Sequence, residues 1–116
     1  MINQCRFICF LLVIFLLEGS NSLIAQEALG KINCICIDAG HGGKDPGAIS
    51  GKLREKDITL AIALKLGKMV KSAYPDLNVV YTRTKDVAVD LRERGRIANK
   101  AKAQLFISIH VNKFSK

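Results

Sequence analysis

Apolar residues occur in three short runs between residues 32 and 110, and polar or glycine-rich segments separate these runs. The first run, over 32–37, is continuous and contains β-branched residues, which is typical of a strand that is buried on both faces. The runs over 78–82 and 105–110 are also rich in β-branched and aromatic residues, and they predict a second and a third strand.

Two segments between these strands have the spacing of apolar residues that is typical of a helix. Over 55–73, apolar residues recur at intervals of three and four residues and predict one core-facing stripe. This stripe consists of Ile58, Ile62, Leu66, Met69 and Ala73. Tyr74 precedes Pro75 and ends the helix, because a residue before proline avoids helical backbone angles.

The second predicted helix begins after Asp90, whose side chain is expected to cap the first turn. Glu93 lies three residues further on and is expected to complete a capping box. The apolar face expected for this helix consists of Leu91, Ile97, Ala98 and Ala101.

A glycine-rich segment over 38–51 connects the first strand to the first helix and predicts a loop with special backbone angles. The order of elements is therefore strand, loop, helix, strand, helix, strand. This order favours parallel strands, with the helices packed against the sheet. We predict an α/β fold, a layered sheet of mainly parallel strands flanked by helices.

The N-terminal segment has the pattern of an export signal. Arg6 precedes eleven uncharged apolar residues over 7–17, a run shorter than the ~20 residues of a membrane-spanning helix. Small residues follow, and they predict a signal peptide over 1–22 that is cleaved after Ser22 or Ala25. An uncleaved membrane anchor is the alternative. With cleavage, the protein is exported to the periplasm or cell envelope without a stable membrane anchor.

The formal net charge is +8, from 18 basic and 10 acidic residues. Nucleic acid is not an expected partner, because the sequence shows no recognition motif and no basic segment interleaved with aromatic residues. An anionic cell wall or membrane surface fits this charge better. Cys34 and Cys36 lie on one face of the first predicted strand, and we interpret them as small buried hydrophobic residues rather than a redox pair.

Both histidines of the chain lie at the ends of predicted strands. His41 follows the first strand and His110 closes the third, at the sheet edge where α/β proteins place their active sites. Glu55 starts the first helix, and two imidazoles with one carboxylate can form a catalytic zinc site. The alternatives are that Glu55 only interacts with the helix dipole, that His110 is a core histidine and that His41 is a turn residue.

Arg83 ends the second predicted strand near this edge of the sheet. It is a candidate for binding a carboxylate of the substrate. A salt bridge with Asp86 or Asp90 is the alternative role.

Five sequence blocks carry a resemblance to a known enzyme family. They are IDAGHGGKDPGA (37–48), REKD (54–57), TRTKD (82–86), LRERGRIAN (91–99) and LFISIHVN (105–112). In this order they resemble the zinc-dependent N-acetylmuramoyl-L-alanine amidases, which are cell-wall hydrolases. The resemblance extends over residues 32–112.

This resemblance implies a reaction, a cofactor and a set of ligands. The reaction is hydrolysis of the amide between N-acetylmuramic acid of peptidoglycan and the L-alanine of the stem peptide. The cofactor is Zn²⁺, and the zinc ligands of the family fall on His41, Glu55 and His110. The implied architecture is the phosphorylase/hydrolase-like amidase fold. The sequence does not identify an activator protein.

The general base of this family is a glutamate located beyond the second histidine. No residue of this chain matches that glutamate, so no general base is assigned. We expect residues 31–116 to be the N-terminal part of the amidase catalytic domain, and the chain to be a fragment of the full enzyme. The alternative is a non-catalytic remnant that binds zinc or the cell wall without hydrolysing it.

Overall fold

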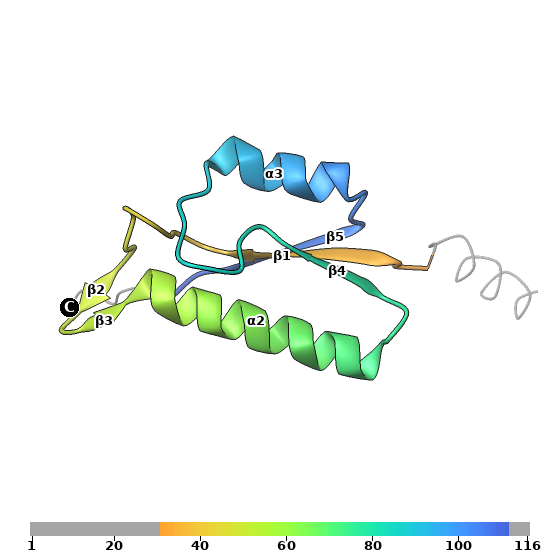
Figure 1. Cartoon of the computed structure of the whole chain (residues 1–116), viewed down its shortest axis with the longest axis horizontal. Helices are drawn as coiled ribbons and strands as arrows, with labels where there is room; N and C mark the ends of the chain where they lie inside the picture. Colours follow the sequence, from red (N-terminus) through yellow and green to blue (C-terminus); the bar gives the residue numbers. More distant parts are fainter. Residues whose placement is uncertain (1–30, 112–116) are drawn as a thin grey trace, which may run out of the picture. The chain divides into compact units, whose positions relative to one another are not determined.

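The computed structural model describes residues 31–111, and their central feature is a parallel sheet of three strands (Figure 1). The strands are β1 (Cys34–Ala39), β4 (Asn78–Tyr81) and β5 (Leu105–Ile109). β1 lies in the middle and pairs in parallel with β4 and with β5. The predicted strands and their parallel arrangement are therefore confirmed.

β1 begins two residues later than the apolar run suggested. Its neighbours set this start, because Cys34 pairs with Asn78, the first residue of β4, and Ile35 pairs with Leu105, the first residue of β5. The strand also extends to Ala39, and all six of its residues are buried. This burial agrees with its position in the centre of the sheet.

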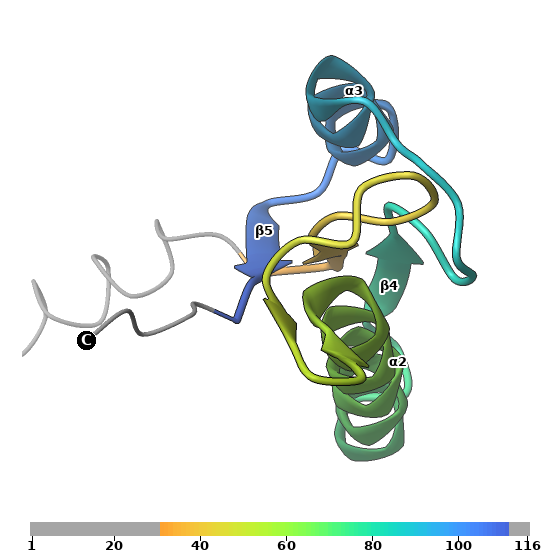
Figure 2. The ribbon, with the colours of Figure 1, turned by 90° about the vertical axis from the view of Figure 1, so that its left-hand side faces the viewer.

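Two helices, α2 (Glu55–Ala73) and α3 (Leu91–Lys100), lie on opposite faces of the sheet (Figure 2). The layers are therefore helix, sheet and helix, which is the predicted α/β fold. The buried core cluster consists of Ile35, Ile37, Ala39 and Ala63. It lies between β1 and α2, and half-buried apolar residues of β4 and β5 pack around it.

The face of α2 that packs on the sheet differs from the predicted stripe. Members of that stripe that face solvent are Ile62, which is 45 % exposed, Met69 and Ala73. The buried residues of α2 are Glu55, Lys56, Thr59, Ala63 and Gly67. A small residue is needed at the last of these positions, because a Cβ on Gly67 would overlap the Tyr81 hydroxyl. The helix therefore approaches the sheet through its small residues, and part of its apolar stripe stays outside.

α3 begins as predicted, with Asp90 as its cap. Oδ1 of Asp90 accepts a hydrogen bond from the Arg92 amide at 2.9 Å. Glu93 lies 3.5 Å from Arg96 in an ion pair on the helix surface, which differs from the capping box that the sequence predicted. Leu91 is 85 % exposed and does not belong to the packed face. The buried residues of α3 are Arg94 and Ala98.

A short antiparallel hairpin lies at the end of the segment that the sequence predicted as a loop. It consists of β2 (Ile49–Ser50) and β3 (Leu53–Arg54). The hairpin leads directly into α2, and the Glu55 amide donates to the Ala48 carbonyl at 2.9 Å. This contact fixes the start of α2 beside the glycine-rich loop.

Cys34 and Cys36 are free thiols and both are buried, as predicted. Burial, together with the nearby carboxylate of Asp38, raises the pKa of the Cys36 thiol. Neither feature suits a reactive cysteine, because reactive cysteines are partly exposed and have a lowered pKa.

The predicted signal peptide over 1–22, with cleavage after Ser22 or Ala25, lies outside the described residues. Within residues 31–111, no helix combines the length and the apolar character that a membrane span requires.

Candidate metal centre

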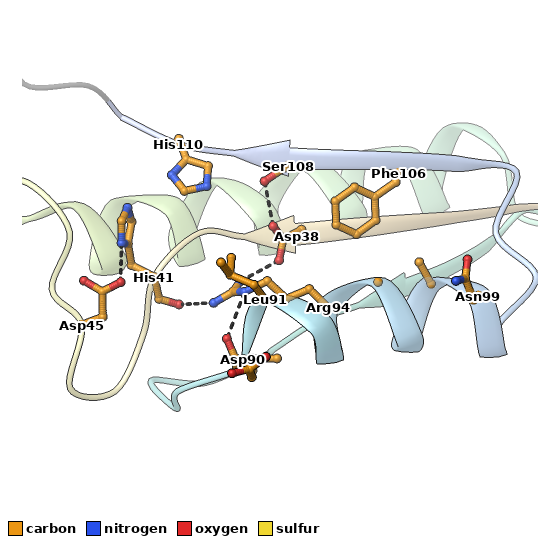
Figure 3. Close-up of a pocket in the computed structure, with 13 residues that line it drawn as sticks. Asp38, His41, Asp45, Asp90, Leu91, Arg94, Asn99, Phe106, Ser108 and His110 are labelled. Carbon is orange, nitrogen blue, oxygen red and sulfur yellow. Dashed lines mark hydrogen bonds and ion pairs between the residues drawn. The ribbon is translucent and has the colours of Figure 1, made fainter.

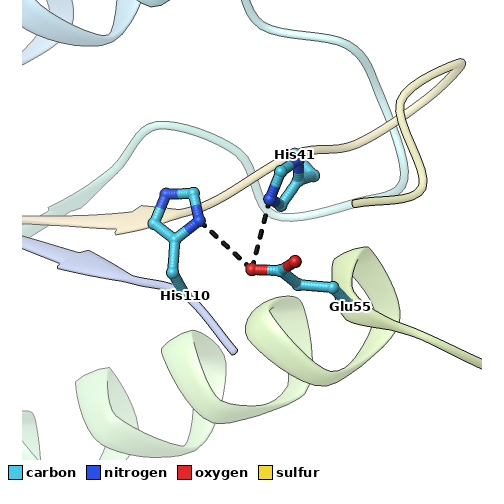
Figure 4. Close-up of side chains that lie close together, drawn as sticks. All are labelled: His41, Glu55 and His110. Carbon is cyan, nitrogen blue, oxygen red and sulfur yellow. Dashed lines mark hydrogen bonds and ion pairs between the residues drawn. The ribbon is translucent and has the colours of Figure 1, made fainter. Parts of the chain in front are cut away.

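The three side chains predicted as metal ligands lie together beyond the carboxyl ends of β1 and β5 (Figure 4). His41 follows β1, Glu55 is the first residue of α2, and His110 follows β5. Oε1 of Glu55 lies 3.2 Å from Nε2 of His41 and 3.2 Å from Nδ1 of His110. One potential ligand atom from each of these residues lies within 4.8 Å of the others. The fold therefore gathers all three residues from distant parts of the chain.

Strand pairing places the two histidines side by side. The Gly40 amide donates to the Ile109 carbonyl at 3.0 Å, so the β1–β5 ladder continues to the residue before each histidine. The centroids of the two rings are 4.9 Å apart and the ring planes are inclined by 80°. His110 is 49 % exposed at its side chain, which does not fit the alternative that it is a core histidine.

Asp45 fixes the orientation of the His41 ring. Oδ2 of Asp45 lies 2.7 Å from Nδ1 of His41, and Nε2 of the same ring is directed towards Glu55. The hydrogen bond from the Gly47 amide and, to a smaller extent, the contact with His41 lower the pKa of Asp45, which is therefore a carboxylate. A carboxylate on the outer nitrogen of a metal-binding histidine fixes its tautomer and raises its basicity. Nε2 is therefore the nitrogen of His41 that is free to bind a metal.

Glu55 is 6 % exposed and accepts two backbone hydrogen bonds. The Ala48 amide donates to Oε2 at 2.9 Å, and the Val111 amide donates to Oε1 at 2.8 Å. Burial acts to raise the pKa of Glu55, but these two amides and the two histidines outweigh it and hold the pKa below its ordinary value. Gly47 has a φ of 65°, and a Cβ there would lie 2.7 Å from Oε2, so the loop leaves this space only with glycine.

The donor set fits a zinc ion. Two imidazole nitrogens and one carboxylate oxygen are the protein ligands of many catalytic zinc sites, which keep a fourth position open for water or substrate. Glu55 is held as an anion by the surrounding amides, so this ligand is in its metal-binding form. It also does more than interact with the dipole of α2, because its carboxylate lies beside both histidines.

A pocket of about 830 Å³ borders the two histidines and extends between α3 and β5 (Figure 3). His41 and His110 lie at one end of the pocket, and Asn99 and Phe106 lie towards the other. Leu91 adds a further apolar side chain to the lining. The pocket therefore opens onto the two histidines of the candidate ligand set.

Arg83 is buried, and its guanidinium is directed towards the protein interior. It donates to the carbonyls of Ala39, Gly40, Lys56 and Lys85 and to Oγ1 of Thr59. Asp86 pairs with Lys56 at 2.6 Å and Asp90 caps α3, so neither forms the salt bridge considered for Arg83. This geometry does not favour binding of a substrate carboxylate, and we interpret Arg83 as a residue that holds the backbone.

Sequence reasoning missed a buried ion pair under the pocket. Nη1 of Arg94 donates to Oδ1 of Asp38 at 2.7 Å, and the Ser108 hydroxyl donates to the same carboxylate (Figure 3). The Thr82 hydroxyl also donates to this carboxylate. Burial acts to raise the pKa of Asp38, but these hydrogen bonds and the charge of Arg94 outweigh it and lower the pKa. The available signal was the position of Arg94, four residues before Ala98 on the predicted buried face of the helix.

Comparison with known sequences gives matches over most of the described residues. The family model for N-acetylmuramoyl-L-alanine amidase matches residues 35–116. The endolysin of Bacillus phage SPP1 is 47 % identical over 78 residues, which are 67 % of this chain and 28 % of that protein. The sporulation-specific N-acetylmuramoyl-L-alanine amidase of Bacillus subtilis (strain 168) is 46 % identical over 78 residues, which are 67 % of this chain and 31 % of that protein.

A solved structure gives the same result for the fold. The catalytic domain of the N-acetylmuramoyl-L-alanine amidase CwlV from Bacillus (Paenibacillus) polymyxa var. colistinus superposes with a TM-score of 0.69 at 44 % sequence identity. The match covers 73 % of this chain and 48 % of that domain. The chain therefore spans about a third of the two curated relatives and about half of the solved domain.

Proposed function

The chain belongs to the N-acetylmuramoyl-L-alanine amidase family, and from this premise we propose that it acts on peptidoglycan. The proposed reaction is hydrolysis of the amide between N-acetylmuramic acid and the L-alanine of the stem peptide. The proposed cofactor is Zn²⁺, with His41, Glu55 and His110 as its ligands. The observation that carries this proposal is the convergence of these three side chains around one carboxylate oxygen.

Each part of the site has a role in this reaction. When bound, zinc polarises an amide carbonyl and lowers the pKa of water to about 7. Glu55 supplies the negative charge that binds the cation, and Asp45 keeps Nε2 of His41 directed into the site. The pocket between α3 and β5 holds the part of the substrate next to the scissile amide.

Peptidoglycan lies outside the cytoplasm, so the substrate requires an exported enzyme. We propose that residues 1–22 are the signal peptide and that the protein acts in the periplasm or cell envelope. The charge of +8 suits an anionic wall. N-terminal sequencing of the exported protein tests this proposal. The expected first residue is Leu23 for cleavage after Ser22, or Gln26 for cleavage after Ala25.

A specific observation favours a second candidate function, which is binding of zinc and cell wall without hydrolysis. Within residues 31–111, the acidic residues that line the pocket or belong to the ligand cluster are Asp38, Asp45, Glu55 and Asp90. Each already accepts hydrogen bonds from other groups of the protein. In this candidate the described part of the chain would bind the metal through His41, Glu55 and His110, while each carboxylate near the pocket is already engaged by another group of the protein.

Hydrolysis of purified peptidoglycan distinguishes the two candidates, because cleavage of this amide exposes a new amino-terminal alanine on the stem peptide. The amidase predicts new amino-terminal alanine and about one zinc per chain. His41→Ala is expected to lose both, whereas the surface variant Arg96→Ala keeps both. Zinc binding without new amino termini favours the second candidate, and unchanged zinc content in His41→Ala contradicts the proposed ligand set.

A further inference from the structure

We infer that Arg83 and Arg94 are positioning residues of the metal centre, which hold the backbone that carries His41. This inference rests on the proposed function, because it concerns the same ligand cluster. Neither guanidinium touches the ligand side chains, so both act through the chain segment between β1 and His41.

Arg94 reaches this segment from α3. Its Nη1 donates to the Ala39 carbonyl at 2.8 Å and its Nη2 donates to the His41 carbonyl at 2.8 Å. The same Nη1 lies 2.7 Å from Oδ1 of Asp38, which also accepts from Ser108, two residues before His110. One guanidinium therefore links the backbone of the first histidine to the strand of the second.

Arg83 reaches the segment from the opposite side, after β4. Its Nε donates to the Ala39 carbonyl at 2.9 Å, and its Nη2 donates to the Gly40 carbonyl at 2.9 Å. The same Nη2 donates at 2.9 Å to the Lys56 carbonyl in the first turn of α2. Arg83 therefore connects the loop of His41 to the helix that begins with Glu55.

Together the two arginines bind three consecutive carbonyls, those of residues 39, 40 and 41. This matters at His41, whose φ of 61° is unfavourable for a residue with a side chain. A backbone in such a conformation persists only when its surroundings hold it. The arginines supply that restraint, and the His41 ring then stays 3.2 Å from Glu55.

The chemistry of the two side chains agrees with this role. Burial and, to a smaller extent, the positive charge of Arg94 lower the pKa of Arg83. Keeping both guanidinium groups charged in the interior therefore has an electrostatic cost. Apolar residues of similar size fill an interior without this cost. A planar guanidinium, however, donates several hydrogen bonds in fixed directions, which neither an apolar residue nor lysine can reproduce.

The test compares Arg83→Lys and Arg94→Lys with Arg92→Lys, a matched exposed substitution in α3 of the full chain. Zinc affinity is measured by competition with a chromophoric chelator, coordination geometry by the visible spectrum of bound Co²⁺, and folding by circular dichroism. We expect each buried variant to bind zinc about 10- to 100-fold more weakly and to change the Co²⁺ spectrum, whereas Arg92→Lys changes neither. A purely structural role changes the melting temperature but leaves the Co²⁺ spectrum as it was.

A second variant covers the case in which Arg94→Lys fails to fold. The double variant Asp38→Asn/Arg94→Gln replaces the buried ion pair with two amides, and we expect it to fold and to bind zinc weakly. Affinity equal to that of the wild type in this variant, or in both lysine variants, overturns the positioning role alone. Absence of zinc binding by the wild-type chain overturns the proposed function and this inference together.

Discussion

At the scale of single residues, the position of His41 is set by contacts on three sides. Asp45 holds Nδ1, Glu55 faces Nε2, and Arg94 binds the carbonyl. Its backbone has a φ of 61°, and its ring lies 4.9 Å from the ring of His110. The histidine is therefore placed before a metal binds, which reduces the conformational entropy lost on binding.

The contact between Asp45 and His41 leads to a prediction for zinc affinity. We expect Asp45→Ala to weaken zinc binding about 10- to 100-fold, because the His41 ring loses the partner that orients it. The side chain of Asp45 is 64 % exposed, so the free energy of unfolding should change little. Competition with a chelator measures the affinity, and Asp57→Ala removes an exposed carboxylate of α2 as the control. Equal affinity of Asp45→Ala and the wild type would contradict the orienting role.

The lowered pKa of Asp38 leads to a prediction for stability in acid. The folded pKa lies below the unfolded value of about 3.9, so the contribution of Asp38 is present above that pH and is lost as the pH falls through the folded pKa. Asp38→Asn leaves Arg94 buried without its anion and should lower the free energy of unfolding by about 3 kcal/mol at neutral pH. Urea unfolding at decreasing pH should show this difference shrinking in acid. Asp76→Asn, at an exposed position, serves as the control, and a difference that is constant with pH would contradict the prediction.

At the scale of elements, the sequence predicted where helices and strands lie better than which way they face. The proximity of His41 and His110 could be predicted, because parallel strands end at one edge of the sheet and both histidines follow such strands. The predicted packed face of α2 was only partly right: Leu66 packs against the core cluster, but Ile62 and Met69 are exposed because the helix approaches the sheet through small residues. Substrate binding by Arg83 stays a prediction that its buried guanidinium does not favour, because sequence does not show that carbonyls of a distant loop surround this side chain.

Each of the two helices contains one glycine, and substituting each glycine by alanine gives a matched test of this packing. A Cβ added at Gly95 in α3 would meet no atom within 4 Å, so Gly95→Ala should raise the free energy of unfolding by about 0.5–1 kcal/mol through helix propensity. Gly67→Ala in α2 should lower it by about 1–3 kcal/mol, because the new methyl group overlaps the Tyr81 hydroxyl. Denaturant unfolding of both variants measures the two changes. Stabilisation by Gly67→Ala would show that α2 does not lie this close to β4.

At the scale of the whole described domain, the three proposed ligands come from separate segments, one that follows β1, one that begins α2 and one that follows β5. A metal bound by all three would connect α2 and the end of β5 to the central strand β1. We therefore expect metal binding and folding to be coupled, since the complete site exists only in the folded protein.

This coupling predicts that zinc raises the melting temperature. A thousandfold excess of free zinc over its dissociation constant stabilises the folded state by about 4 kcal/mol, and a chelator should remove that gain. Thermal unfolding with zinc and with chelator measures the shift. His41→Ala should show almost no shift, and a shift as large as that of the wild type would place the metal elsewhere.

The position of β5 also has a consequence for the kinetics of metal exchange. β5 pairs with β1 along one edge, and no strand within residues 31–111 pairs with its other edge. His110 follows this strand and is half-exposed, whereas Glu55 is buried and His41 is held by Asp45. We therefore expect an incoming ion to bind first to His41 and Glu55, with His110 completing the coordination last. In the reverse direction we expect His110 to dissociate first, while the Val111 amide, which donates to Oε1 of Glu55 at 2.8 Å, keeps the end of β5 near the site for rebinding.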